Sequence, residues 1–296
     1  MSHHEPLVTI GSDAKDQEEH RLRRRMARIR RRLVVMSGKG GVGKSTAAAN
    51  LAVALSSRGH TVGLLDVDIH GPSIPRILGC EGASIVSDRQ SILPVEVRDR
   101  LTLMSIEFFI GNKTDVLIWR GPMKFKLIQQ FLCDVAWGDL DYLVVDCPPG
   151  TGDEPLSVTQ LIGRPAAAVV VTTPQELAVA DVRRCITFCQ KADLPIAGVL
   201  ENMSEYVCPQ CGIHTDLFGT GGGERLSQEM SVPFLGRIPI DPRIVVCGDV
   251  GSCLLEAHPE SAAAQSYLSL ADRLHGQEDL WSGAAAAALT AREAPR

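Results

Sequence analysis

The residues with the clearest chemical purpose form one glycine-rich loop near the start of the sequence. The loop consists of Gly38, Lys39, Gly40, Gly41, Val42, Gly43, Lys44 and Ser45. An apolar run precedes it and a helix-forming run follows, so its backbone N–H groups and the positive end of a helix dipole can face a phosphate. Lys44 would reach the β- and γ-phosphates, the Ser45 hydroxyl would bind Mg²⁺, and Thr46 would add a phosphate contact. The loop predicts a nucleotide-binding P-loop.

Acidic residues follow two other apolar runs and can complete this site. Asp146 ends one run and would hold Mg²⁺, directly or through water. Asp66 and Asp68 follow the other run, and one of them would orient the attacking water. We assign this catalytic role to Asp68 and place it with Ser45 and Asp146 around the Mg²⁺. The alternative is that Asp66 or Asp68 only caps the next element.

A second candidate site is the segment CPQCG, in which two residues separate Cys208 from Cys211. A turn of this kind can aim two thiolates at one metal while backbone N–H groups hydrogen-bond to the sulfurs. A [4Fe–4S] cluster or a structural zinc needs four ligands, and the sequence contains no second CxxC. A symmetric dimer would bring two such pairs together on its two-fold axis. Zinc, or a dithiol pair without metal, is the alternative.

The other seven cysteines carry no comparable pattern. Cys185 and Cys189 lie four residues apart on an expected helix, and Cys247 and Cys253 lack metal-like neighbours, so we interpret all four as core residues. The total of nine is odd and no signal peptide is apparent, which argues against a secreted disulfide framework. No apolar run approaches the ~20 residues that span a bilayer. We therefore expect a soluble, cytoplasmic protein.

Strands alternating with helices must position these residues. Buried strands are expected at 33–36, 61–65, 101–106, 142–145, 166–172, 196–200 and 234–238. Helices are expected at 45–55, 175–191, 222–230 and 259–274. The near-continuous apolar runs predict an α/β fold with a single doubly wound, mostly parallel sheet and helices on both faces. Ligands in such folds bind beyond the carboxyl ends of the strands.

Composition divides the 296 residues into one domain with two irregular ends. Residues 1–32 are expected to form a polar, then basic arm that is largely disordered. Residues 33–275 form the expected ATPase domain, and residues 276–296 an Ala-rich flexible tail. The basic stretch RLRRRMARIRRR at 21–32 is either a solvated arm or a contact for an acidic partner or nucleic acid. The net charge of −5 gives the whole molecule no basic face, so nucleic acid is not the expected partner.

Several segments together resemble the Mrp family of iron–sulfur cluster carrier ATPases, which belongs with the MinD, ParA and nitrogenase iron protein group. These segments are SGKGGVGKST, DVDIHGPSIPRILG, WRGPM, DYLVVDCPPGTGD, ENMS and CPQCG. They extend from about Leu33 to about Asp241, which is most of the chain. The resemblance implies a P-loop of the deviant Walker A type and a slow, switch-like ATPase.

The resemblance also implies roles for particular residues. Lys39 is the signature lysine, which crosses to the partner's nucleotide in an ATP-bound sandwich homodimer. Asn202, Pro239 and Asp241 match positions near the adenine and ribose. Paired with their symmetry mates, Cys208 and Cys211 would hold one [4Fe–4S] cluster. The implied function is to carry this cluster from a donor to apo-proteins.

Some eukaryotic relatives in this family carry an additional N-terminal cysteine cluster, but here no cysteine precedes Cys80. A second, stably held cluster is therefore not expected. The competing functions are a MinD- or ParA-like positioning ATPase and a zinc-bridged, ATP-dependent dimer switch. The first gives the CxxC no purpose, although the arginine run mildly favours it. The C-terminal segment AAAAALTAREAPR lacks the basic amphipathic character of a membrane-targeting helix, so no membrane contact is expected.

Overall fold

The computed structural model describes residues 10–87, 91–109, 121–208 and 210–281. A nine-stranded sheet forms the centre of this part of the chain. Its strands are β1 (Ile29–Ser37), β2 (Val62–Asp66), β5 (Val95–Arg98), β6 (Leu101–Ser105), β7 (Leu140–Asp146), β8 (Ala166–Thr172), β9 (Ile196–Val207), β10 (His214–Thr215) and β11 (Phe234–Ile240). Their order is β10-β9-β8-β1-β7-β2-β6-β5, with β11 also paired to β9. Only β5 and β10 pair antiparallel in this described sheet. A separate hairpin pairs β3 (Val86–Ser87) with β4 (Ile92–Leu93).

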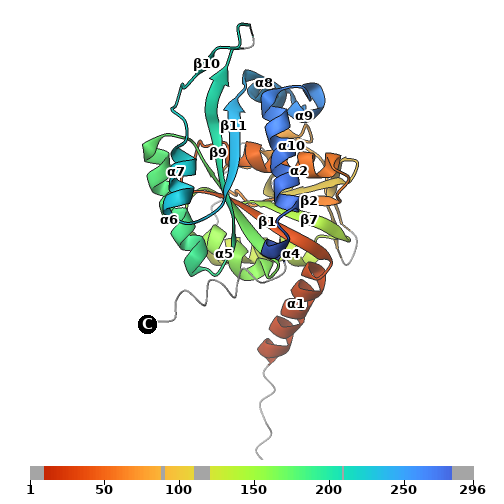
Figure 1. Cartoon of the computed structure of the whole chain (residues 1–296). Helices are drawn as coiled ribbons and strands as arrows, with labels where there is room; N and C mark the ends of the chain where they lie inside the picture. Colours follow the sequence, from red (N-terminus) through yellow and green to blue (C-terminus); the bar gives the residue numbers. More distant parts are fainter. Residues whose placement is uncertain (1–9, 88–90, 110–120, 209, 282–296) are drawn as a thin grey trace, which may run out of the picture.

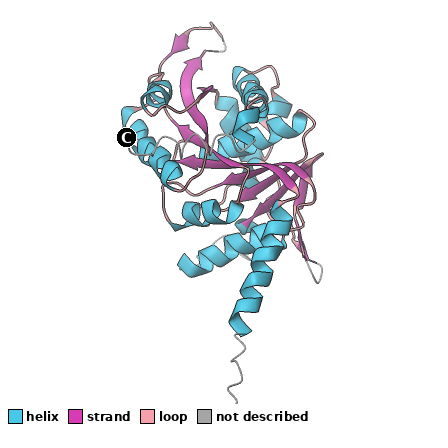
Figure 2. Ribbon diagram, turned by 60° about the horizontal axis from the view of Figure 1, so that its bottom comes forward, coloured by secondary structure: helices cyan, strands magenta, loops and turns pink. Residues whose placement is uncertain are grey.

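Helices cover both faces of the sheet (Figures 1 and 2). The helices are α1 (Ile10–Met26), α2 (Lys44–Ser57), α3 (Ile74–Ile77), α4 (Gly121–Asp134), α5 (Asp153–Ile162), α6 (Glu176–Lys191), α7 (Gly222–Glu229), α8 (Pro242–Val250), α9 (Leu254–Ala257), α10 (Ala262–His275) and α11 (Glu278–Trp281). Residues of α2, α9 and α10 form one apolar core, and residues of α1, α4, α5, α6 and α7 form the other. The predicted α/β fold with a mostly parallel sheet is confirmed.

Side chains of the central strand β1 alternate between the two cores. Leu33 and Val35 pack into the core that contains α2, whereas Val34 and Met36 pack into the core that contains α6. Successive side chains of a strand point to opposite faces, so a strand covered on both sides needs an unbroken apolar run. This is why the runs in the sequence identified strands of a parallel sheet.

The N-terminal arm differs from the expectation of disorder over residues 1–32. Within it, Ile10–Met26 forms α1, and residues 1–9 lie outside the described part of the chain. Leu22 and Met26 are buried in the same core as α4, on one side of α1. Leu22 and Met26 are four residues apart, so both lie on one face of the helix. This spacing is a packing signal that the charged residues around them conceal.

The first strand also begins earlier than the apolar run indicated. Ile29 is buried and pairs with Leu140, so β1 starts four residues before Leu33. Arg32 is buried within this extension, and its guanidinium donates to the carbonyls of Met26 and Ile29. Burial lowers the pKa of Arg32 to about 10. Arginine is rarely placed inside a protein, so nothing in the residue types indicated that the strand extends across Arg32.

The predicted C-terminal tail, residues 276–296, is described only at its beginning. Its residues Glu278–Trp281 form the single turn α11, and residues 282–296 lie outside the described part. No helix within the described residues is both long and apolar enough to cross a bilayer. Two helices that the sequence interpretation omitted, α4 and α5, cover the face that holds α6.

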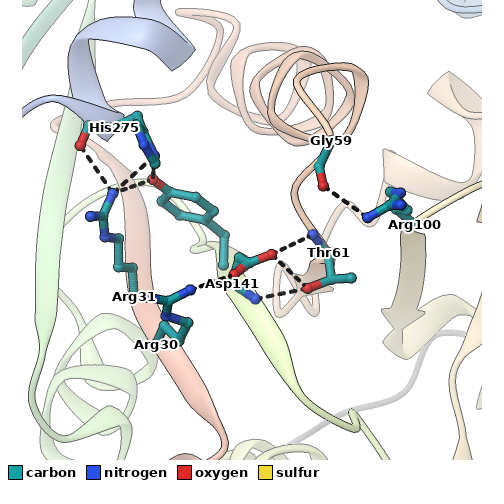
Figure 3. A network of polar contacts seen from close by, with 8 residues as sticks. Arg30, Arg31, Gly59, Thr61, Arg100, Asp141 and His275 are labelled. Carbon is teal, nitrogen blue, oxygen red and sulfur yellow. Dashed lines mark hydrogen bonds and ion pairs between the residues drawn. The ribbon is translucent and has the colours of Figure 1, made fainter.

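The amino ends of β1, β2 and β7 are joined by a polar network (Figure 3). The Asp141 carboxylate accepts hydrogen bonds from the backbone N–H and the hydroxyl of Thr61, each at 2.9 Å. It also pairs with Arg30 at 3.3 Å. Arg100 donates to the carbonyl of Gly59 at 3.0 Å, beside the turn between α2 and β2. These contacts fix the starts of the strands at the edge away from the glycine loop.

The end of α10 is fastened to the same edge by His275. Arg31 donates to the hydroxyl of Tyr142 at 2.7 Å and to the carbonyl of His275 at 3.0 Å. The ring of His60 lies 4.6 Å from the ring of His275 between centroids. Burial lowers the pKa of His60, and His275 and the nearby arginines Arg31 and Arg30 lower it further, whereas Asp141 opposes them.

We expect acid to weaken this attachment through His60. Its pKa in the folded state lies below the ordinary 6.5, so the unfolded chain binds more protons, and stability falls as the pH drops through that value. Thermal unfolding of wild type and His60→Asn between pH 7.5 and 5.5 should show a smaller loss in the variant. Because the ring is half-exposed, the difference should be below about 1 kcal/mol. His20→Asn, at an exposed position of α1, is the control. Equal losses in wild type and His60→Asn would contradict the prediction.

Candidate functional site

The glycine loop connects the end of β1 to the start of α2. Gly43 precedes α2 with φ 79°, and a Cβ at this position would lie 2.2 Å from Nδ2 of Asn202. Within the described residues no side chain caps the start of α2, so its first N–H groups remain available to a phosphate. The Ser37 hydroxyl donates to the carbonyl of Lys39 at 2.9 Å and fixes the beginning of the loop. Glycine at position 43 is thus required by both conformation and space.

A cavity of about 240 Å³ lies over this loop. The residues that line it come from the loop, from the segment after β2 and from the segment after β7, and include Lys39, Lys44, Ser45, Thr46, Asp68 and Pro149. The structure therefore brings together most of the residues that the sequence assigned to phosphate and Mg²⁺. Their individual roles remain predictions.

Lys44 lies at the centre of the charges around this cavity. Its Nζ is 2.6 Å from Oδ1 of Asp146, 3.9 Å from Oδ2 of Asp68 and 3.2 Å from the hydroxyl of Ser45. Burial lowers the pKa of Lys44, but the carboxylates of Asp146 and Asp68 outweigh burial and raise it. The buried ammonium therefore stays charged and is in position to exchange a carboxylate for a phosphate oxygen.

Asp146 provides an oxygen suited to a metal ion. The residue is fully buried, and within the described structure its Oδ2 has no hydrogen-bond partner. Burial raises its pKa, while the contact with Lys44 opposes this change. A divalent cation would satisfy the free oxygen, and the nearby Ser45 hydroxyl and Asp68 carboxylate are also hard ligands. The residues present fit Mg²⁺, which would supply charge neutralisation at the phosphates.

Asp66 and Asp68 occupy different environments although one residue separates them. Asp66 is fully buried and accepts hydrogen bonds from the N–H of Asp68 and the hydroxyl of Ser105, both at 3.1 Å. Burial, and then the charge of Asp146, raises the pKa of Asp66 to about 8. Asp66 thus holds the backbone of Asp68 while Asp68 faces the cavity. Ser105, at the end of β6, was missed because nothing near it in the sequence suggested a partner for Asp66.

The segment around Asn202 touches the loop from β9. Nδ2 of Asn202 donates to the carbonyl of Val42 at 2.9 Å. The next residue, Met203, has φ 55°, and the pairing of β9 with β11 shifts register just beyond Asn202. A non-glycine residue in the left-handed region marks local backbone strain. This irregularity directs Asn202 at the loop itself, so Asn202 supports the loop backbone in addition to any contact with a nucleotide.

The two other positions matched to the base and ribose lie at the end of β11. Pro239 belongs to the strand, and Asp241 caps α8 by accepting from the N–H of Arg243 at 3.0 Å. Beside α8 lies a second cavity of about 300 Å³, which shares Thr46 and Ser73 with the loop cavity. Pro239 and Asp241 do not line this second cavity. Asn50 and Ile244 do line it, and the sequence interpretation had not identified either residue.

The cysteine pair lies where β9 and β10 form a hairpin (β9 and β10 in Figure 1). The N–H of Cys208 donates to the carbonyl of Ile213 at 3.0 Å, and the N–H of Gly212 donates to the carbonyl of Cys208 at 2.8 Å. Backbone N–H groups of Cys211 and then Gln210 lower the pKa of Cys208. The turn therefore favours the thiolate, which is the form that binds metal.

The surroundings of the pair add no further metal ligands. Cys208 is half-buried and Cys211 is exposed. In the part of the chain that the structure describes, no group of three or more His, Cys, Asp or Glu side chains is arranged to hold a metal. Cys185, Cys189 and Cys247 are buried in the two cores, as expected for structural cysteines. One chain thus offers two accessible thiols at this turn.

Comparison with known proteins matches residues 28–275 to the ParA family of NUBPL iron-transfer P-loop NTPases. A nucleotide-binding protein from Archaeoglobus fulgidus, solved in complex with ADP and with cobalt, is 40% identical with a TM-score of 0.70 over 79% of this chain and 91% of that one. The cell division ATPase MinD of Pyrococcus furiosus is 23% identical with a TM-score of 0.60, over 83% and 98%. MinD of Pyrococcus horikoshii with Mg-ADP is 24% identical with a TM-score of 0.60, over 84% and 97%.

The fold, the glycine loop and these matches establish that the chain is a nucleotide-binding P-loop NTPase. It belongs to the ParA family of NUBPL iron-transfer P-loop NTPases. The predicted relationship to the Mrp iron–sulfur carriers is thereby confirmed at the level of the family. The two MinD structures establish only that the fold is shared.

Asp68 can be tested separately from nucleotide binding. We expect Asp68→Asn to slow ATP hydrolysis by about a hundredfold, the usual range for a residue that positions or deprotonates the nucleophile. ATP affinity should change by less than about threefold, because Lys44 and the loop N–H groups remain. Single-turnover hydrolysis and equilibrium ATP binding measure the two quantities. Asp272→Asn, on the exposed face of α10, is the control. Equal losses of binding and turnover would make Asp68 a structural or metal residue instead.

Proposed function

We propose that this ATPase carries an iron–sulfur cluster, holding one [4Fe–4S] cluster between two copies of the chain and transferring it to apo-proteins. The observation that carries the proposal is the turn at Cys208 and Cys211. Two accessible thiols stand on it, and backbone N–H groups lower the pKa of Cys208. Hydrogen bonds from N–H groups to sulfur are also a feature of protein-bound clusters.

The homodimer supplies the missing ligands in this proposal. A four-thiolate site needs two such turns, and a two-fold axis beside Cys211 would provide them from identical chains. Exposed apolar side chains follow the turn in the sequence, since Ile213 is 62% exposed and Leu217 is 56% exposed. Their burial between subunits would favour the dimer and exclude water from the cluster.

ATP would occupy the loop cavity and the adjoining cavity in the same proposal. Lys39 is half-exposed beside the loop, and its ammonium forms no ion pair with any described residue. It is therefore available to cross to the partner's nucleotide, as the family resemblance implies. The nucleoside would extend past Thr46 towards Asn50. Asn202, Pro239 and Asp241 remain predicted contacts of the adenine and ribose.

The cargo can be identified directly. Protein purified without oxygen should show broad sulfide-to-iron absorption near the visible range and contain about two irons and two sulfides per chain, because one four-iron cluster serves two subunits. Incubation with an apo-acceptor should move the iron and sulfide to that protein. Zinc without sulfide would select the zinc-bridged switch. Absence of iron, sulfide and zinc would favour a positioning ATPase.

The remaining parts of the proposal concern location and partners. We place the carrier in the cytoplasm, where reduced thiols persist, with a cluster donor and apo-protein clients as its partners. The proposal includes no binding to a membrane or nucleic acid.

A further inference from the structure

Two loop segments approach the phosphate loop from neighbouring strands. The first follows β2 and contains Asp68 and His70, and the second, residues 147–152, follows β7 and leads into α5. Asp68 from the first segment and Pro149 from the second line the same cavity as Lys44. Because both segments line the cavity over the phosphate loop, their relative placement would determine the geometry of ATP hydrolysis.

A single side chain on a third element contacts both the first segment and the start of α5, into which the second segment leads. Nζ of Lys124, in the first turn of α4, lies 2.5 Å from Oε1 of Glu154 at the start of α5. The same Nζ lies 3.0 Å from Nε2 of His70 in the first segment. His70 and Glu154 are themselves 3.6 Å apart between Nε2 and Oε1. Residues separated by 54 and 30 positions thus meet at one ammonium group.

The contact of Lys124 with Glu154 is more shielded from solvent than its contact with His70. The side chains of Lys124 and Glu154 are 15% and 11% exposed, and that of His70 is 65% exposed. Burial raises the pKa of Glu154, but hydrogen bonding to Lys124 and to its own backbone outweighs burial and lowers it. The shielded pair therefore stays ionised and fixes Lys124 on α5. His70 lies on the solvent side of the Lys124 ammonium.

We propose that Lys124 is a positioning residue for ATP hydrolysis, which holds the segment carrying Asp68 in register with the segment that follows Asp146. Lys124 is not among the residues that line the loop cavity, so it acts through His70 and Glu154. Segments in these positions change when the γ-phosphate is bound or lost in P-loop proteins. The bond to both makes them move as one unit, so Asp68 reaches its place only when α5 does.

The two contacts can be removed one at a time. His70→Ala cuts the link to the first segment, and the exposure of His70 means that the melting temperature should stay unchanged. Lys124→Met cuts both links but leaves Glu154 as a buried carboxylate without its lysine, which endangers folding. Lys124→Met with Glu154→Gln removes both charges together and avoids that problem. Lys126→Met, at an exposed position two residues further along α4, is the matched control.

We expect His70→Ala and the Lys124→Met/Glu154→Gln double variant to lower kcat for ATP by about tenfold, since small misplacement of a catalytic group is costly. KM should stay within about twofold, because the loop and Lys44 are untouched. A purely structural role predicts that the double variant, once its melting temperature matches wild type, recovers the wild-type kcat. Wild-type kcat in either variant would overturn the proposal, as would an equal loss in Lys126→Met. The measurement uses the complete chain and needs no iron–sulfur cluster, so its outcome is independent of the cargo.

Discussion

Lys44→Ala should abolish ATP hydrolysis, with a loss of about a hundredfold or more. The wild-type ammonium is buried between Asp146 and Asp68, where it can meet the charge that develops on the transferring phosphoryl group. Alanine removes that charge, although the loop N–H groups and Mg²⁺ can still bind the phosphates. Steady-state phosphate release with Mg²⁺ and saturating ATP measures the effect. Hydrolysis at the wild-type rate would show that the loop is not the active site.

The same substitution should destabilise the fold, and this effect must be separated from catalysis. Without Lys44, the fully buried Asp146 loses its cation, and breaking a buried pair costs about 3–5 kcal/mol. Lys44→Ala combined with Asp146→Asn removes both charges and should recover most of that stability without recovering hydrolysis. Thermal unfolding of the two variants measures the recovery. Lys191→Ala, at the end of α6, is a control for loss of a lysine elsewhere.

Cys208→Ala and Cys211→Ala should each abolish cluster binding, so that iron falls from about two atoms per chain to nearly none. Each substitution removes two of the four thiolates from a symmetric dimer, because the change occurs in both subunits. The thermal stability of the separate subunit should change little, since Cys211 is exposed and Cys208 is half-buried. Iron and sulfide analysis after anaerobic reconstitution is the measurement.

Cys80→Ala is the matched control for these variants. Cys80 is also half-buried, but burial raises the pKa of its thiol to about 11 and it lies near α3. Its replacement should leave the iron content unchanged. Full iron content in the Cys208→Ala/Cys211→Ala double variant would rule out the shared cluster at this turn. Loss of iron in Cys80→Ala alone would move the site elsewhere.

The local parts of the site were accessible from the sequence because each depends on neighbouring residues. Gly43 and Lys44 belong to one contiguous loop between a strand and a helix, so spacing alone places them. Asp146 could be identified because it ends an unbroken apolar run, and ligands in parallel sheets lie beyond the strand ends. The strands themselves were visible because a sheet covered on both faces needs apolar residues at every position.

The parts that the sequence concealed depend on the order of the strands. Ser105 reaches Asp66 only because β6 lies next to β2, and Lys124 reaches Glu154 only because α4 packs beside α5. No local periodicity reports such a contact. Arg32 was misleading for another reason. Its charge suggested a solvent-exposed side chain, whereas its guanidinium donates hydrogen bonds to backbone carbonyls inside the protein.

A backbone rotation at Met203, whose φ of 55° makes the backbone of β9 irregular, would make this residue a pivot. On one side of this pivot, Asn202 is bonded to the phosphate loop, and on the other side the strand continues to Cys208. Five residues of extended strand make an arm of about 17 Å. A turn of about 5° at the pivot would move the Cys208 end by about 1.5 Å over that length, whereas metal–ligand distances tolerate only about 0.2 Å. Such a rotation would therefore displace the thiols by far more than it displaces the phosphate loop.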